Sequence, residues 1–177
     1  MHAIIIFPDL PEVVIEQVQV AEEITLTLRT TSPTASCPKC GTRSTRVQSR
    51  YTRSLHDLPA SGRPVSLILH VRRFVCTKST CAQKIFTERL PELCRPQAQR
   101  TIQLQQALCQ LGLASGGQAG ADIGSEQGMS GSRDTILRLV RRHQLPDPSP
   151  SHTIGIDDWA WKRRQRYGTL ICDLESR

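Results

Sequence analysis

The sequence lacks any long apolar run, and this absence narrows the classes of protein that it can encode. None of its hydrophobic stretches approaches the roughly 20 residues that a helix needs to cross a bilayer. The first residues, MHAIIIFPDLPE, lack the basic region and the long apolar stretch of a signal peptide. Internal repeats are absent as well. We therefore expect no membrane association and a location in the cytoplasm.

The charge of the chain is unevenly distributed. Of the 177 residues 38% are hydrophobic and 22% charged, a balance that favours one domain or two small ones over wholesale disorder. Residues 37–100 hold thirteen Lys and Arg against three acids, whereas residues 1–36 hold one Arg against five acids. Such a concentrated basic region is typical of proteins that bind polyanions. A surface that merely happens to be basic is the alternative, and we favour a nucleic acid partner.

Seven cysteines are a high and odd count for a chain without a secretory signal. Four of them form two close pairs, Cys37-x2-Cys40 and Cys76-x4-Cys81, which indicate metal ligands before disulfides. Zn²⁺ takes four thiolates in a tetrahedron, and the letters CPKCG favour a tight turn around the first pair. We predict a structural zinc site that leaves no position for a catalytic water. The alternatives are unrelated buried thiols, a redox pair or a histidine in place of one thiolate.

Alternation of apolar and polar side chains predicts strands on both sides of the first cysteine pair. VVIEQVQV and ITLTLRT, separated by residues 21–23, predict a β-hairpin within residues 1–36. The alternation over residues 65–75, after a turn at 61–64, predicts a strand that links the two cysteine pairs. We expect residues 37–95 to form a zinc-binding β domain that resembles a zinc ribbon with a long insertion.

Zinc would hold this basic strand surface rigid, so that its arginines could meet DNA phosphates. We expect phosphate contacts from Arg43, Arg46, Arg50, Arg53, Arg72 and Arg73. Arg72 and Arg73 are neighbours on a strand and point to opposite faces, so the two cannot both contact DNA in the same way.

Residues 96–144 are expected to be helical. Apolar spacing predicts helices over 100–113, about 116–124 and 132–143, with Ser132 as the N-cap of the last. The second and third have helix-turn-helix proportions, in which the N-terminal residues of the second helix read base edges. An ordinary helix pair inside a bundle fits the pattern equally well. We expect base reading by Ser130, Ser132, Arg133 and Thr135, and phosphate contacts by Arg138, Arg141 and Arg142.

Five stretches in order carry a resemblance to a known family. CPKCG, SRYTRSLHDLPASGRPVSLILHVRRFVC, FTERLP, SGSRDTILRLVRR and IGIDDWAWKRRQRYGTLICDLE resemble the ISL-three family of bacterial insertion-sequence transposases, over nearly the whole chain. The resemblance implies an α+β multi-domain fold: a zinc-binding domain, a helix-turn-helix, a Pro-rich linker at 145–153, and the start of an RNase H-like nuclease at 154–177. It also implies a nucleoid-associated protein.

The resemblance implies roles for particular residues. Cys37, Cys40, Cys76 and Cys81 would bind zinc, residues 116–143 would bind element-end DNA, and Asp157 would be the first acid of a DDE triad. In such a nuclease two Mg²⁺ ions bracket the scissile phosphate. On a strand Asp157 points with Gly155, away from the neighbouring isoleucines, which suits a ligand.

The nuclease resemblance covers only about two strands, TIGIDDWAW and RYGTLICDL, whereas a domain of this kind needs on the order of 100 residues. We therefore expect a C-terminally truncated transposase that binds double-stranded DNA at element ends without cleaving it alone. Zinc is the expected cofactor, with Mg²⁺ only for a complete nuclease domain. A homodimer or an intact transposase are further expected partners.

Four alternatives remain open from the sequence. The chain could be a stand-alone zinc-containing regulator or an inhibitor of an intact transposase. A second polypeptide could supply the missing acids and complete the enzyme. The zinc module could serve protein contacts alone, in which case DNA binding would be weak and insensitive to salt. Finally, the gene could be decaying and its product inert.

Overall fold

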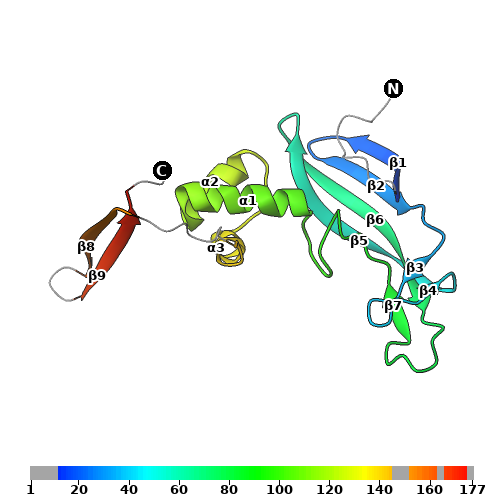
Figure 1. Cartoon of the computed structure of the whole chain (residues 1–177). Helices are drawn as coiled ribbons and strands as arrows, with labels where there is room; N and C mark the ends of the chain where they lie inside the picture. Colours follow the sequence, from blue (N-terminus) through cyan, green and yellow to red (C-terminus); the bar gives the residue numbers. More distant parts are fainter. Residues whose placement is uncertain (1–11, 145–151, 163–165, 175–177) are drawn as a thin grey trace. The chain divides into compact units, whose positions relative to one another are not determined.

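The computed structural model describes residues 12–144, 152–162 and 166–174. The chain divides into two units, Met1–His143 and Gln144–Arg177 (Figure 1). The expected linker at 145–153 lies almost wholly outside the described residues.

The first unit is built on a sheet with the strand order β1-β2-β6-β5 and with β7 beside β6 (Figure 1). Its strands are β1 (Val13–Val20), β2 (Ile24–Thr30), β5 (Val47–Ala60), β6 (Arg63–Val75) and β7 (Ile85–Thr87). β1 and β2 form the predicted antiparallel hairpin, but β2 also pairs with β6 in parallel, with Ile24 opposite Val65. The boundary expected at residue 36 therefore does not separate two sheets.

β5 and β6 form the longest hairpin of this sheet. The sequence pattern indicated β6 but not β5, whose first half is largely polar and exposed. Ser61 and Gly62 turn the chain between them with φ angles of 52° and 72°. Alternate apolar residues of the sheet fill one core: Ile24, Leu26, Leu28, Leu55, Val65, Leu67, Leu69 and Val71. Each such side chain contributes roughly 1.5–3 kcal/mol when it is fully buried.

Three helices follow the sheet: α1 (Ile102–Ser115), α2 (Gly117–Glu126) and α3 (Arg133–Arg141). Thr101 caps α1, and Ser132 caps α3 by accepting a hydrogen bond from Thr135 N, as predicted. Leu104, Leu108, Ala121 and Ile136 form the helical core, and Leu58 of β5 packs against it. None of the described helices is long and apolar enough to cross a membrane.

The second unit is a two-stranded hairpin of β8 (Ile154–Lys162) and β9 (Arg166–Asp173). Both strands expected in this stretch are present. Ile156 lies opposite Ile171, and the two side chains are 66% and 65% exposed. Within the described residues of this unit, the hairpin therefore has an apolar surface without a buried core.

Candidate zinc centre and nucleic-acid interface

The first cysteine pair lies in a tight turn between β3 (Ala35–Ser36) and β4 (Arg43–Ser44). Cys37 N donates to Thr42 O at 3.0 Å, and Gly41 N donates to Cys37 O at 2.8 Å. Gly41 has a φ of 72°, a left-handed conformation that glycine adopts without strain. This turn brings the Cys37 and Cys40 sulfurs to one side of the chain.

The second pair is placed by β6 and β7. Cys76 follows β6 directly and donates its backbone N–H to Lys84 O at 2.8 Å, while Cys81 N donates to Lys78 O at 3.1 Å. A hydrogen bond of 2.9 Å from Val75 N to Arg46 O ties the end of β6 to the first turn. The two pairs therefore meet at one end of the β5–β6 hairpin.

The four sulfurs fit a single zinc ion. The Sγ atoms of Cys37 and Cys81 lie 3.9 Å apart, those of Cys40 and Cys76 lie 3.6 Å apart, and all four lie within 4.8 Å of one another. Tetrahedral Zn–S bonds of about 2.3 Å place sulfurs about 3.8 Å apart, whereas a disulfide needs about 2.05 Å. The four cysteines thus form a structural zinc site, and the protein fills every coordination position.

The surroundings give the thiols different proton affinities in the metal-free protein. Hydrogen bonds with the side chain and backbone of Thr42 lower the pKa of Cys40 to about 6. The backbone hydrogen bond with Lys78 lowers the pKa of Cys76, but burial and the neighbouring thiols outweigh it and raise this pKa to about 12. Zinc binds thiolates, so the proton of Cys76 must leave when the ion binds.

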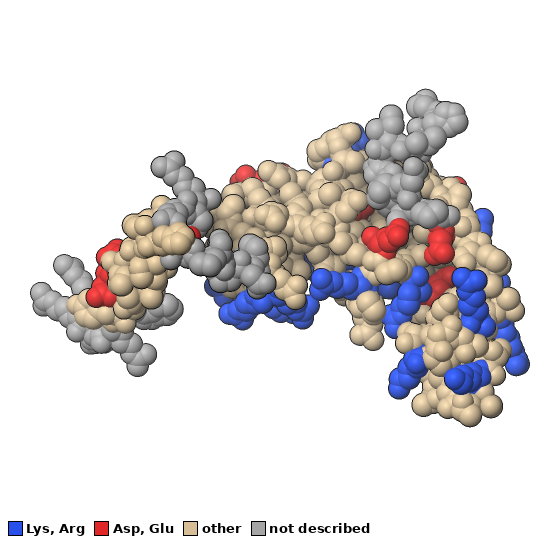
Figure 2. Space-filling model, viewed as in Figure 1, with Lys and Arg blue, Asp and Glu red and all other residues tan. Residues whose placement is uncertain are grey.

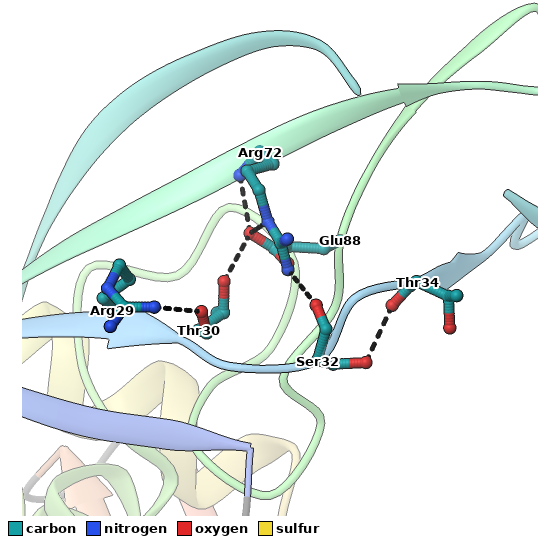
Figure 3. A network of polar contacts seen from close by, with 6 residues as sticks. All are labelled: Arg29, Thr30, Ser32, Thr34, Arg72 and Glu88. Atoms are coloured by element: carbon teal, nitrogen blue, oxygen red, sulfur yellow. Dashed lines mark hydrogen bonds and ion pairs between the residues drawn. The ribbon is translucent and has the colours of Figure 1, made fainter. Parts of the chain in front are cut away.

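Arg72 is engaged inside the protein (Figure 3). Its Nη2 donates to the Glu88 carboxylate at 2.8 Å and to Ser32 O at 2.6 Å, and its backbone N donates to the same carboxylate at 2.6 Å. The Thr30 hydroxyl donates to Glu88 as well, at 3.1 Å. Arg72 therefore braces β6 against the segments after β2 and β7, and its guanidinium does not face solvent as the DNA prediction requires. Sequence reasoning missed Glu88, which nothing in its local sequence singles out.

The other arginines predicted to contact DNA from the sheet region differ in exposure. Arg43, Arg46, Arg50 and Arg73 are exposed. The guanidinium of Arg73 lies over the Tyr51 ring, 4.7 Å from its centroid, in a cation–π contact. Arg53 is half-buried, and its Nη2 donates to Ala98 O at 2.6 Å. Arg53 therefore anchors the backbone of residues 95–100.

The residues predicted on α3 lie at its first turn and along its exposed side. Ser132 and Arg133 are exposed, Thr135 is half-buried, and Ile136 points into the helical core with none of its surface exposed. Arg133 forms only an exposed ion pair with Asp134, which contributes little. The remaining predicted residues, Arg138, Arg141 and Arg142, are exposed.

Asp157 lies on β8 and is exposed. The neighbouring Asp158 accepts a hydrogen bond from the Thr169 hydroxyl at 2.9 Å. Among the described residues, the four cysteines are the one group of three or more potential metal ligands that could hold an ion. Asp157 therefore belongs to no cluster of three or more potential metal ligands among the described residues.

Comparison with known proteins identifies the cysteine region. Residues 33–81 match the family model described as the zinc-finger of transposase IS204/IS1001/IS1096/IS1165, and the match includes both cysteine pairs. No curated protein and no solved structure matches the chain. Residues 33–81 are therefore a zinc-ribbon domain of the ISL3 transposase type.

Proposed function

Starting from this transposase zinc ribbon, we propose that the chain is the DNA-binding portion of an insertion-sequence transposase and recognises double-stranded DNA at element ends. The observation that carries the proposal is the match over residues 33–81, because a zinc ribbon of this kind implies a transposase-related DNA-binding role. The residues that would contact DNA are inferred from charge, exposure and helix geometry.

The basic surface supports a DNA partner. Lys and Arg side chains gather along one side of the first unit, over the helices and over the strands near the zinc site (Figure 2). Exposed arginines attract the phosphate backbone, and each phosphate that they neutralise adds affinity and salt dependence. Because Arg72 is held by Glu88, we leave it out of the proposed interface. We leave out Arg53 as well, because it is half-buried and donates to Ala98 O. The arginines that we keep in the sheet region are Arg43, Arg46, Arg50 and Arg73.

The helices support a helix-turn-helix role. α2 and α3 are joined by a turn at residues 127–132, and both pack on α1 around Leu108 and Ile136. This packing leaves the first turn of α3 open to solvent, which is the part that reads base edges in this motif. We assign base reading to Ser132, Arg133 and Thr135, and phosphate contacts to Arg138, Arg141 and Arg142.

DNA binding can be tested with zinc-loaded protein and a short mixed-sequence duplex, by fluorescence anisotropy. With six to ten phosphate contacts, affinity should fall by roughly 10³–10⁵ between about 50 and 200 mM salt. A variant with Arg138, Arg141 and Arg142 changed to Gln should bind more weakly, with a shallower salt dependence. The control would be Arg29, Arg63 and Arg89 changed to Gln, three exposed arginines outside the proposed interface whose loss changes the net charge by the same amount. Weak binding that does not respond to salt would refute the proposal.

We propose that Asp157 is the acid matching the first member of a nuclease triad, and that this chain alone does not cleave DNA. The proposal is supported by the exposure of Asp157 on a two-stranded hairpin and by the fact that, among the described residues, Asp157 joins no cluster of three or more potential metal ligands. Two-metal catalysis needs more than one carboxylate. Nicking of supercoiled DNA with Mg²⁺ that disappears in Asp157→Ala would contradict this expectation.

A further inference from the structure

A basic cleft lies between α3 and the irregular segment that precedes α1. It has a volume of about 510 Å³, and no acidic residue lines it. Neutral polar side chains, including Gln99, Gln105 and Thr135, complete its walls. Its charged lining residues are Arg95, Arg100, Arg138 and Arg142.

The backbone of residues 95–100 is fixed by contacts with the sheet and the helices. Arg53 donates from β5 to Ala98 O at 2.6 Å, and His56 N donates to Gln99 O at 2.9 Å. Arg100 also ties this segment to the turn before α3, because its Nε donates to Ser130 O at 2.6 Å. Gln97 has a φ of 59°, a left-handed conformation that is uncommon outside glycine and is concentrated at functional sites. The shape of the cleft is therefore held by hydrogen bonds to other parts of the fold.

Among the described residues, no ion pair neutralises the positive charges of the cleft. None of the three ion pairs found among the described residues involves a cleft arginine. Burial lowers the pKa of Arg100, and electrostatic repulsion between the guanidinium groups of Arg100 and Arg138 lowers it further. Arg138 uses its Nε to reach Asp134 O at 3.1 Å, so this contact leaves its two terminal nitrogens free to point elsewhere. An anion in the cleft would relieve this repulsion.

We propose that the cleft binds a backbone phosphate of double-stranded DNA, with Arg95 and Arg100 on one side and Arg138 and Arg142 on the other. A planar guanidinium group can donate two parallel hydrogen bonds to the oxygens of one phosphate, and all four charged residues of the cleft are arginines. Thr135 lines the same cleft and belongs to the first turn of α3. A phosphate held here would fix the position of α3 relative to the bases, since phosphate contacts set register and base contacts set sequence.

The inference rests on the proposed DNA-binding function, but it adds a contact from outside the helix-turn-helix. Arg95 precedes α1 and belongs to no helix or strand, so a model in which α2 and α3 alone contact DNA gives it no role. In the cleft, one phosphate would be bound from two sides: by the segment that follows the zinc ribbon, and by α3. Arg95 is therefore the residue that tests the inference most directly.

The experiment compares two exposed arginines that carry the same charge, with the full zinc-loaded chain and a mixed-sequence duplex. Arg95→Gln should weaken binding about tenfold and reduce the slope of log affinity against log salt by about 1. Arg63→Gln, at the tip of the β5–β6 hairpin and outside the cleft, should change neither quantity appreciably. Arg142→Gln is a second cleft variant that should repeat the effect of Arg95→Gln.

Each outcome decides the inference. If wild type binds the duplex and both cleft variants match Arg63→Gln, the cleft is not a phosphate site and Arg142 contacts no phosphate, although DNA binding by the chain stands. If wild type does not bind any duplex, the proposed function and the inference both fail. Saturable binding of inorganic phosphate that is lost in Arg95→Gln, with duplex binding unchanged, would identify a small-anion site and overturn the DNA assignment.

Discussion

Removing the Glu88 side chain should destabilise the first unit strongly. The side chains of Glu88 and Arg72 are only 6% and 17% exposed, and the carboxylate accepts from Arg72 and from the Thr30 hydroxyl. Glu88→Ala would leave the Arg72 charge partly buried without a partner. Removal of one member of a buried ion pair costs about 3–5 kcal/mol, so we expect that loss in the free energy of unfolding.

The loss can be measured by denaturant unfolding of the zinc-loaded protein, or as a fall in melting temperature of about 10–20 °C. Glu92→Ala is the matched control, because Glu92 is an exposed glutamate four residues further along the chain. The control should change stability by no more than about 0.5 kcal/mol. A comparison of the two substitutions removes the effect of net charge.

A double substitution distinguishes two causes of the destabilisation: the unpaired Arg72 charge and the loss of the Glu88 contacts. Arg72→Met combined with Glu88→Met leaves no unpaired charge, and apolar replacement of a buried ion pair is often nearly neutral. The double variant should therefore be more stable than Glu88→Ala and should keep the salt dependence of DNA binding. The reasoning would be refuted by a Glu88→Ala protein within about 1 kcal/mol of wild type, or by a double variant no more stable than the single one.

Two further predictions concern the zinc site and the helical core. The pKa of Cys76 is about 12 and that of Cys40 about 6, so near neutral pH zinc displaces a proton mainly from Cys76 of this pair. Zinc affinity should then rise at least about tenfold per pH unit between about pH 6.5 and 7.5 in competition with a chelating dye, and a flat profile would contradict this. A Cβ on Gly112 would lie 2.3 Å from Ile136 Cγ2. Gly112→Ala should therefore cost about 1–3 kcal/mol in denaturant unfolding, whereas Gln110→Ala, on the exposed side of α1, should cost less than about 0.5 kcal/mol; equal effects would rule out overpacking.

Features with a local signature could be predicted from the sequence. The zinc ligands follow from two short spacings, because a turn of a few residues is enough to bring two sulfurs together. The structure confirms that all four sulfurs of the two pairs lie within 4.8 Å. The N-cap at Ser132 is equally local, because its oxygen accepts a hydrogen bond from an amide three residues further along. The predicted DNA contacts stay predictions.

Features that depend on distant pairing could not be predicted. The parallel pairing of β2 with β6 joins residues about 40 positions apart, as Ile24 opposite Val65 illustrates. β5 could not be predicted because no residue in its first half is buried, so polar side chains are tolerated there and the apolar alternation of a strand is missing. The sequence around Arg72 is that of any basic strand residue, because its partner Glu88 lies 16 positions further along the chain. The cleft around Arg95 uses irregular backbone, which has no periodic pattern.

The parallel pairing of β2 with β6 also has a consequence for folding during synthesis, because β2 cannot form this pairing until β6 has been made. At about 5–20 residues per second, the ribosome needs about 2–8 seconds after β2 to synthesise β6. During that time the edge of β2 that pairs with β6 has no hydrogen-bonding partner from β6. The chain between the two strands carries the first cysteine pair, and the second pair follows β6. A zinc ion captured early by the first pair can complete its coordination only after β6 and the second pair have been synthesised. Metal supply in the cell would therefore influence how long an unpaired, aggregation-prone strand edge persists on each nascent chain.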